Sequence, residues 1–274
     1  STVARLVVGL YEPTRGSIEF DGTDIATIKG AAGVAALRRR LQIIFQDPYA
    51  SLNPRWRVRD IVAEPIRVHR LLRGRAVMRA RVDELLGEVG LSAADGEKYP
   101  HEFSGGQRQR ISIARALASA PEFLVCDEPT SALDVSVQAQ ILNLIKDLQR
   151  TLGLTYLFIS HNLAVVRHMS DRVGVMYLGR ICELADAETL FRGPRHPYTR
   201  MLLETIPDLE LTGRARTPVA GEVPSAIDPP SGCSFHPRCP FANERCKRER
   251  PELRPTDGTL VACHAVEEGR MPAA

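Results

Sequence analysis

Three short apolar runs, at residues 41–45, 123–126 and 155–159, stand out in the pattern of hydrophobic and polar positions along the chain. Continuous apolar runs of this length are typical of strands that are buried in a parallel sheet. Apolar residues at helical spacing lie between the last two runs, at residues 141–148. This order of strand, helix and strand predicts an open α/β sheet, in which ligands bind at the carboxyl ends of the strands.

The rest of the pattern predicts the elements around this sheet. In chain order they are a helix at residues 3–10, a strand at 16–20, an Arg-rich helical lobe at 57–99, a helix after residue 104, a hairpin at 172–184 and a short helix at 187–191. Beyond residue 193, prolines interrupt a stretch with little periodicity, and we expect extended, poorly regular structure there. We therefore predict an α/β domain at residues 1–192, with a helical subdomain at about 55–118, and an irregular Cys/Pro-rich extension at 193–274.

The composition is that of a folded globular protein, with 44% hydrophobic and 25% charged residues. The 36 basic residues exceed the 33 acidic ones by too little to indicate a nucleic-acid partner. No apolar run is long enough to cross a bilayer and no signal peptide opens the chain, so we expect a cytoplasmic protein.

Polar side chains follow each of the three predicted strands. Gln46 follows the first strand, Asp127 and Glu128 the second, and His161 the third. In phosphoryl-transfer sites one carboxylate holds Mg²⁺ through water while another polarises the attacking water. Taken singly, two such acids are common in a solvated turn, and a lone histidine is more often structural than catalytic. The interpretation therefore depends on their order and context.

A glycine turn stands directly before a predicted helix, at Ser104, Gly105, Gly106 and Gln107. Ser104 is a natural N-cap, and the two glycines let backbone N–H groups approach an anion at the helix N-terminus. The turn therefore suits a phosphate ligand. The alternative is an ordinary capped turn, because short glycine motifs are weak signals.

In this order, Gln46, the SGGQ turn, DEP at 127–129, SALD at 131–134 and His161 resemble the Q-loop, signature, Walker B, D-loop and H-loop of the ATP-binding cassette (ABC) family. The resemblance implies an ABC-type P-loop NTPase domain that binds ATP and Mg²⁺.

The same resemblance implies a role for each residue. Asp127 would support Mg²⁺, Glu128 would act as catalytic base, and His161 would contact the γ-phosphate. Gln46 would sense metal and nucleotide, and Asp134 would act across a dimer interface.

The phosphate loop of this family reads G-x-x-G-x-G-K-[ST]-[ST], and only its last two positions match here, at Ser1 and Thr2. Ser1 would be a Mg²⁺ ligand. We therefore expect a fragment that is truncated inside this loop and impaired in binding ATP.

The C-terminal third of the chain resembles that of dipeptide and oligopeptide importer ATPases. The matching segments are RHPYT at 195–199, GEVPS at 221–225, PPSGC at 229–233 and PRCP at 237–240. With QDPYASLNPR at 46–55, the resemblance favours the F-type ATPase subunit. It implies a motor subunit that hydrolyses ATP to drive uptake of di- and oligopeptides, bound peripherally at the cytoplasmic face of the cell membrane.

The resemblance also implies partners. They are a second, D-type ATPase subunit in a head-to-tail nucleotide sandwich, two transmembrane permease subunits and, indirectly, an extracytoplasmic substrate-binding protein. An ATPase for nickel or glutathione import, or a nucleotide-binding module without turnover, are the alternatives. A soluble ABC ATPase of DNA repair or translation is disfavoured, because the sequence shows neither a coiled-coil insertion nor a second cassette.

The six cysteines fall into two groups. Cys126 and Cys182 lie in apolar runs and are predicted to be small buried hydrophobes. The other four have five, six and sixteen residues between them, so paired CxxC zinc spacing is not present. They are Cys233, Cys239, Cys246 and Cys263. Four thiolates suit zinc or a [4Fe–4S] cluster, and the absence of metal is a third possibility. The resemblance to peptide-importer ATPases favours the iron–sulfur cluster.

Overall fold

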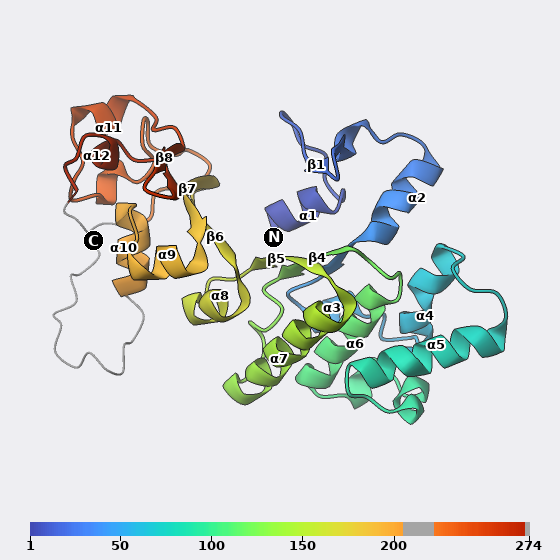
Figure 1. Ribbon diagram of the computed structural model, residues 1–274. Helices are drawn as coiled ribbons and strands as arrows, with labels where there is room; N and C mark the ends of the chain where they lie inside the picture. Colours follow the sequence, from blue (N-terminus) through green and yellow to red (C-terminus); the bar gives the residue numbers. More distant parts are fainter. Residues whose placement is uncertain (205–221, 272–274) are drawn as a thin grey trace. The chain divides into compact units, whose positions relative to one another are not determined.

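The computed structural model describes residues 1–204 and 222–271 (Figure 1). It forms two compact units, residues 1–161 and 162–274, which we describe in turn. The helices of the first unit are α1 (Thr2–Val7), α2 (Ala31–Arg40), α3 (Pro48–Ser51), α4 (Val58–Val68), α5 (Arg75–Glu88), α6 (Gly105–Leu117) and α7 (Val135–Leu152), with short 3-10 turns η1 (Ile25–Thr27), η2 (Ala93–Glu97) and η3 (Pro100–Glu102). Its strands are β1 (Glu19–Phe20), β2 (Thr23–Asp24), β3 (Leu41–Ile44), β4 (Phe123–Asp127) and β5 (Thr155–Ile159).

The central sheet of the first unit has the order β3-β4-β5, and its strands are parallel. Ala4 and Val8, in and after α1, pack against Val125 of β4 on one face of the sheet. Helices α6 and α7 lie on the opposite face (Figure 1). All three strands therefore end at one edge, as the apolar runs predicted, and polar residues that follow them come close together.

The segment predicted to be helical contains helices α4 and α5, which pack against each other and against α6. Its core consists of fully buried aliphatic side chains, among them Ile61, Val62, Leu85 and Leu86. Apolar residues at helical spacing form this core, which fixes the lobe to the helix that follows the SGGQ turn.

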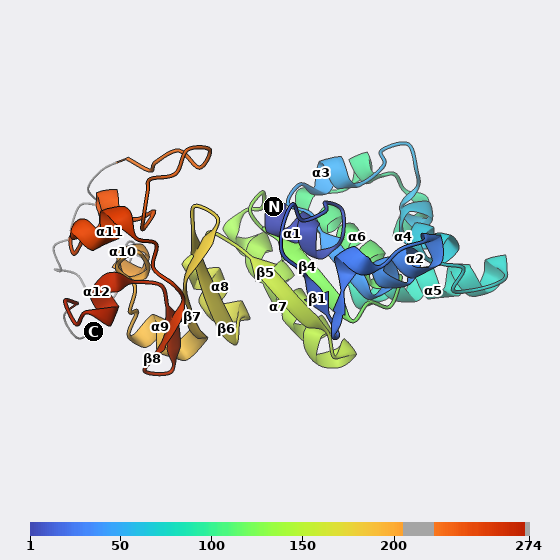
Figure 2. The same ribbon diagram turned by 90° about the horizontal axis from the view of Figure 1, so that it is seen from above.

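The second unit is built on an antiparallel sheet of order β6-β7-β9-β8. Its strands are β6 (Arg172–Tyr177), β7 (Arg180–Asp186), β8 (Arg254–Thr256) and β9 (Thr259–Val261), and its helices are α8 (Leu163–Met169), α9 (Ala187–Arg192), α10 (Pro197–Glu204), α11 (Glu244–Arg248) and α12 (His264–Glu267), with the 3-10 turn η4 (His236–Arg238). The long hairpin of β6 and β7 is visible in Figure 2. Leu178 and Gly179 form its turn with φ of 44° and 76°, so the predicted hairpin is confirmed.

The expectation of poorly regular structure beyond residue 193 is wrong for much of the described part. Helices α10, α11 and α12 and strands β8 and β9 lie there. Each is too short to give a periodic signal, and Pro197 occupies the first position of α10, where a missing N–H costs nothing. Pro207, Pro218 and Gly221 lie outside the described residues.

Strands β6 and β7, which we assigned to the first domain, share their sheet with β9 near the C-terminus. The domain boundary expected near residue 193 stays a prediction. Within the described residues no helix combines the length and apolar character needed to span a bilayer.

Candidate active site

Glu128 stands directly after β4 in a backbone conformation that few residues other than glycine adopt, with φ of 49°. Its N–H donates to the carbonyl of Ile159, the last residue of β5, at 2.9 Å. Left-handed backbone costs free energy, and such residues cluster at functional sites, where the surrounding structure holds them in place. The sheet thus fixes the direction in which the Glu128 side chain leaves the strand.

Both carboxylate oxygens of Glu128 have a partner from a neighbouring strand end. Oε1 lies 2.9 Å from Nδ1 of His161, and Oε2 accepts a hydrogen bond from Nε2 of Gln46 at 3.1 Å. The side chain of His161 is 74% exposed and that of Glu128 22%, so the pair lies at the surface of the sheet edge. The structure therefore brings together three residues that lie 82 and 33 positions apart in sequence, as their places after parallel strands predicted.

Asp127 is buried at the end of β4, with 3% of its surface exposed. Its Oδ1 has no hydrogen-bond donor, and the nitrogen of Ser1 lies 3.5 Å away. An unsatisfied buried carboxylate oxygen is costly unless a cation or donor reaches it. Asp127 therefore fits a predicted Mg²⁺ ligand in chemistry, and Ser1 lies beside it. Thr2 follows as the exposed first residue of α1.

The SGGQ turn caps α6 through reciprocal hydrogen bonds. The Ser104 Oγ accepts from the N–H of Gln107 at 3.3 Å, and Oε1 of Gln107 accepts from the N–H of Ser104 at 3.0 Å. A Cβ on Gly106 would lie 2.3 Å from Cγ1 of Val137, so only glycine fits at this position. The first turn of α6 therefore rests directly against the first turn of α7.

Asp134 caps the same end of α7. Its Oδ1 accepts from the N–H of Val137 at 3.0 Å and from Oγ of Ser136 at 2.7 Å, and these bonds hold the pKa of the carboxyl below its usual range. Among the described residues, no hydrogen bond joins Asp134 or the SGGQ turn to the Glu128 side chain. The predicted residues thus form two groups, one at the strand ends and one at the helix N-termini.

Arg108 is a residue that sequence reasoning did not single out. It is buried, and its guanidinium donates to the carbonyls of Pro100 at 2.6 Å and His101 at 3.3 Å. The same group lies over the ring of Tyr49 at 3.9 Å. It thus links the segment after Gln46 to the start of α6. An arginine directly after SGGQ, at the start of a buried helix, was the signal that could have drawn attention to it.

Burial does not separate the two groups of cysteines, because Cys246 of the tail is buried like Cys126 and Cys182. Cys126 and Cys182 are buried, and burial raises the pKa of the Cys126 thiol to about 12. Among the described residues, no group of three or more His, Cys, Asp or Glu side chains is placed to hold a metal ion. Burial also raises the pKa values of Cys233, Cys239 and Cys263, with a smaller contribution from the neighbouring thiols. The predicted iron–sulfur cluster gains no support from the described residues.

A parallel sheet whose strand ends gather paired carboxylates, an amide and a histidine, together with glycine-rich and acidic caps on adjoining helices, defines a nucleotide-hydrolysing α/β domain. Comparison with known proteins agrees. The family described as "ABC transporter" matches residues 1–131, and the family described as "Oligopeptide/dipeptide transporter, C-terminal region" matches residues 182–246. The chain belongs to the ABC transporter ATP-binding proteins, in the branch named for oligopeptide and dipeptide transport.

Curated relatives are similar over most of their length. A putative oligopeptide transport ATP-binding protein of Bacillus subtilis (YkfD) is 53% identical over 96% of this chain and 81% of its own. A di/tripeptide transport ATP-binding protein of Pseudomonas aeruginosa (DppF) is 49% identical over 98% of this chain and 83% of its own.

Solved structures support the same fold. Clostridium perfringens cbiO1, part of a cbiONQ ABC transporter complex, is 30% identical with a TM-score of 0.61, over 70% of this chain and 74% of its own. The ATP-binding cassette MJ0796, solved as a dimer with ADP and phosphate, is 27% identical with a TM-score of 0.61, over 68% of this chain and 79% of its own. These likenesses confirm the predicted ABC-type P-loop NTPase fold.

Proposed function

We propose that this protein is the ATP-hydrolysing motor subunit of an importer that takes up di- and oligopeptides. Membership of the ABC family carries the ATPase activity of the intact protein, and the names of the relatives support peptides as cargo. The observation that carries the proposal is the Glu128 carboxylate, held between His161 and Gln46 at the end of β4.

Each residue at the strand ends then has a role. Glu128 accepts the proton of the attacking water, because it is the carboxylate at the sheet edge that is open to solvent and oriented from both sides. His161 orients this carboxylate and contacts the γ-phosphate, and Gln46 senses the metal and the nucleotide. Asp127 and Ser1 hold Mg²⁺, with Thr2 beside them; when bound, this ion neutralises charge on the transferred phosphoryl group.

The second group of residues serves a partner subunit. Ser104, Gly105, Gly106 and Gln107 would complete the nucleotide site of a D-type ATPase in a head-to-tail sandwich, and Asp134 would act across the same interface. The dimer of MJ0796 supports such an arrangement by analogy. Two transmembrane permeases and, indirectly, an extracytoplasmic binding protein complete the assembly, with this subunit peripheral on the cytoplasmic face of the membrane.

Within this proposal the chain is the F-type subunit, with a cassette at residues 1–192, a helical subdomain at about 55–118 and a peptide-importer extension at 193–274. The match of the C-terminal family to residues 182–246 supports the last part. A nucleotide-binding module without turnover is disfavoured, because such a module has no need of a base linked to a histidine.

The test is Glu128→Gln in the protein with a complete phosphate loop. ATP turnover should fall by at least about 100-fold while ATP binding is kept, because a neutral amide cannot accept the proton. Glu122→Gln is the matched control: Glu122 precedes the same strand at its other end, pairs with Arg40 and should leave turnover unchanged. Equal turnover in Glu128→Gln and the parent would refute the catalytic assignment.

Cargo is tested separately, by uptake into vesicles that contain the assembled transporter. Labelled di- and oligopeptides should accumulate in an ATP-dependent way and compete with one another. Accumulation of nickel or glutathione in place of peptides would redirect the proposal to those alternatives and leave the ATPase assignment intact.

A [4Fe–4S] cluster at Cys233, Cys239, Cys246 and Cys263 rests on the sequence alone and gains no support from the described residues. Anaerobically purified protein settles the matter. A cluster requires bound iron and broad visible absorbance, both lost when the four cysteines become serine. Protein without iron would exclude it, and stoichiometric zinc would assign the thiols to that metal instead.

A further inference from the structure

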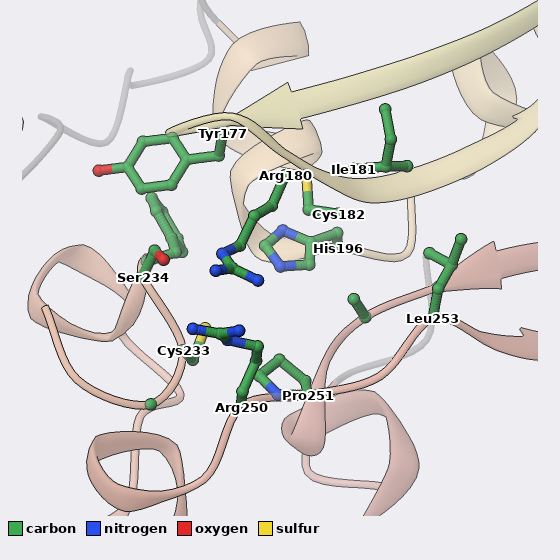
Figure 3. Close-up of a pocket in the computed structure, with 13 residues that line it drawn as sticks. Tyr177, Arg180, Ile181, Cys182, His196, Cys233, Ser234, Arg250, Pro251 and Leu253 are labelled. Carbon is green, nitrogen blue, oxygen red and sulfur yellow. The ribbon is translucent and has the colours of Figure 1, made fainter. Parts of the chain in front are cut away.

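A small pocket lies within the second unit, between the β6–β7 hairpin and the chain on either side of α11 (Figure 3). It has a volume of about 100 Å³. Ile181, Phe235, Pro251 and Leu253 contribute apolar walls. A cavity of this size holds a small ion or the end of a larger molecule, and apolar walls strengthen any electrostatic interaction inside it.

Two arginines point into this pocket from opposite sides. Arg180 is the first residue of β7 and Arg250 follows α11, and Figure 3 shows both guanidinium groups directed into the same space. Neither has a hydrogen-bond or carboxylate partner within residues 1–204 and 222–271. Other arginines of the same unit are paired with Asp or Glu; they include Arg195, Arg245, Arg254 and Arg270.

Arg180 and Arg250 are both exposed, and their positive charges would attract an anion into the space between them. The two guanidinium groups together offer ten N–H donors. Each planar guanidinium can bind two oxygens at once, so the pair suits a ligand group with several acceptor oxygens.

His196 supplies a further donor at the base of the pocket. Its ring faces the space between the arginines and is almost fully buried, with 2% of its surface exposed. Nδ1 accepts a hydrogen bond from the N–H of Tyr198 at 3.0 Å, so the proton of the neutral ring is on Nε2. Burial lowers the pKa of His196 to about 4, which keeps the ring neutral near pH 7.

Glu183 fixes the position of this histidine. The carboxylate of Glu183 is fully buried and accepts the backbone N–H groups of Arg195 at 2.7 Å and His196 at 3.0 Å. A donor that is held in place before the ligand arrives loses little entropy on binding. The pocket therefore has one rigid neutral donor and two mobile cationic ones.

We propose that this pocket binds a phosphate group, held by Arg180, Arg250 and the imidazole N–H of His196. The charge of the pocket favours a dianion. The two guanidiniums carry two positive charges and the imidazole ring is neutral, so a single carboxylate would neutralise only one of the two charges. The phosphate is either free inorganic phosphate or the terminal group of a nucleotide. This pocket shares no residue with the strand-end group of Gln46, Asp127, Glu128 and His161. The proposal also holds whichever cargo the transporter takes up.

The test follows the imidazole signals of His196 by NMR while inorganic phosphate is added, because phosphate bound at the nucleotide site would not move them. Phosphate should shift the Nε2 signal in a saturable way. Arg180→Gln should weaken binding by at least about tenfold, since a charge-assisted bond is lost, and Arg180→Lys should weaken it less. Arg192→Gln is the matched control, because Arg192 lies on α9 outside the pocket and pairs with Glu188.

Further titrations distinguish the sources. Tighter binding of inorganic phosphate than of AMP assigns the pocket to the free ion, and the reverse order assigns it to a nucleotide. Acetate that binds as tightly as phosphate would overturn the charge argument. An unchanged His196 signal, or equal affinity in Arg180→Gln and Arg192→Gln, would overturn the site itself.

Discussion

Nδ1 of His161 lies 2.9 Å from Oε1 of Glu128, although the two residues leave different strands. The contact arises because β4 and β5 are parallel neighbours, paired up to Asp127 and Ile159, so that residues just beyond each strand meet. A hydrogen bond from the ring to one oxygen, with Gln46 at the other, leaves the carboxylate little freedom to rotate. The parallel pairing of β4 with β5 thus both orients the Glu128 carboxylate and places it where water can reach it.

Replacement of His161 should therefore impair turnover more than replacement of Gln46. We expect His161→Ala to lower kcat by about 100-fold, because the Glu128 carboxylate that accepts the proton is then no longer oriented by the ring. Gln46→Ala should lower it by only about fivefold, because one neutral hydrogen bond is lost. Steady-state ATPase assays on the protein with a complete phosphate loop measure both. Equal effects of the two variants would show that the histidine has no special role.

Gly106 is predicted to be the position in the SGGQ turn that is least tolerant of a side chain. Ala at Gly106 would place Cβ 2.3 Å from Cγ1 of Val137, whereas at Gly105 the nearest atom, Cδ2 of Leu133, is 3.4 Å away. We expect Gly106→Ala to destabilise the fold by about 1–3 kcal/mol, the usual cost of overpacking, and Gly105→Ala to cost less.

Urea unfolding of both variants checks this expectation. Val137→Ala removes the clashing methyl groups, so the double variant Gly106→Ala/Val137→Ala should recover part of the stability that the first substitution loses. If the effects of the two substitutions on the free energy of unfolding were additive, the contact between α6 and α7 would not be the cause of the destabilisation.

The stacking of Arg108 on Tyr49 gives a third prediction. Tyr49→Ala should lower the free energy of unfolding by about 0.5–2 kcal/mol, since the cation–π contact is lost and a buried guanidinium loses its cover. Tyr49→Phe keeps the ring and serves as the control. Chemical denaturation of the three proteins gives the comparison, and identical midpoints would mean that the exposed ring contributes nothing.

The strand-end residues could be predicted from the sequence because all strands of a parallel sheet end at the same edge. Residues that follow successive strands therefore lie side by side at that edge. Three apolar runs, together with the rule that consecutive strands are neighbours in a sheet, were enough to predict that Gln46, Glu128 and His161 come together. The packing of Gly106 on Val137 could not be predicted, because it depends on the distance between two helices. Arg108 was missed for a similar reason, since its partners come from two separate segments, at Tyr49 and at Pro100 and His101.

The second unit was harder to predict than the first. Its β8 and β9 have three residues each and pair with each other, and β9 joins them to the sheet by pairing with β7, a long-range contact that no local pattern reports. The pocket of Arg180, His196 and Arg250 likewise joins residues from three segments. The arginines carry no pattern of their own, and their lack of acidic partners is evident only in three dimensions.

The buried ring of His196 predicts how stability depends on pH. Burial lowers its pKa from 6.5 to about 4, so between these values the unfolded chain binds a proton that the folded protein excludes. Stability contributed by the neutral ring is therefore complete above about pH 6.5 and is lost as the pH falls towards 4.

His196→Asn removes this titration, and its side-chain oxygen can still accept the N–H of Tyr198. Urea unfolding at pH 7, 6 and 5 should show a steeper decline for the parent than for this variant. Parallel curves for the two proteins would show that His196 is not the group that titrates.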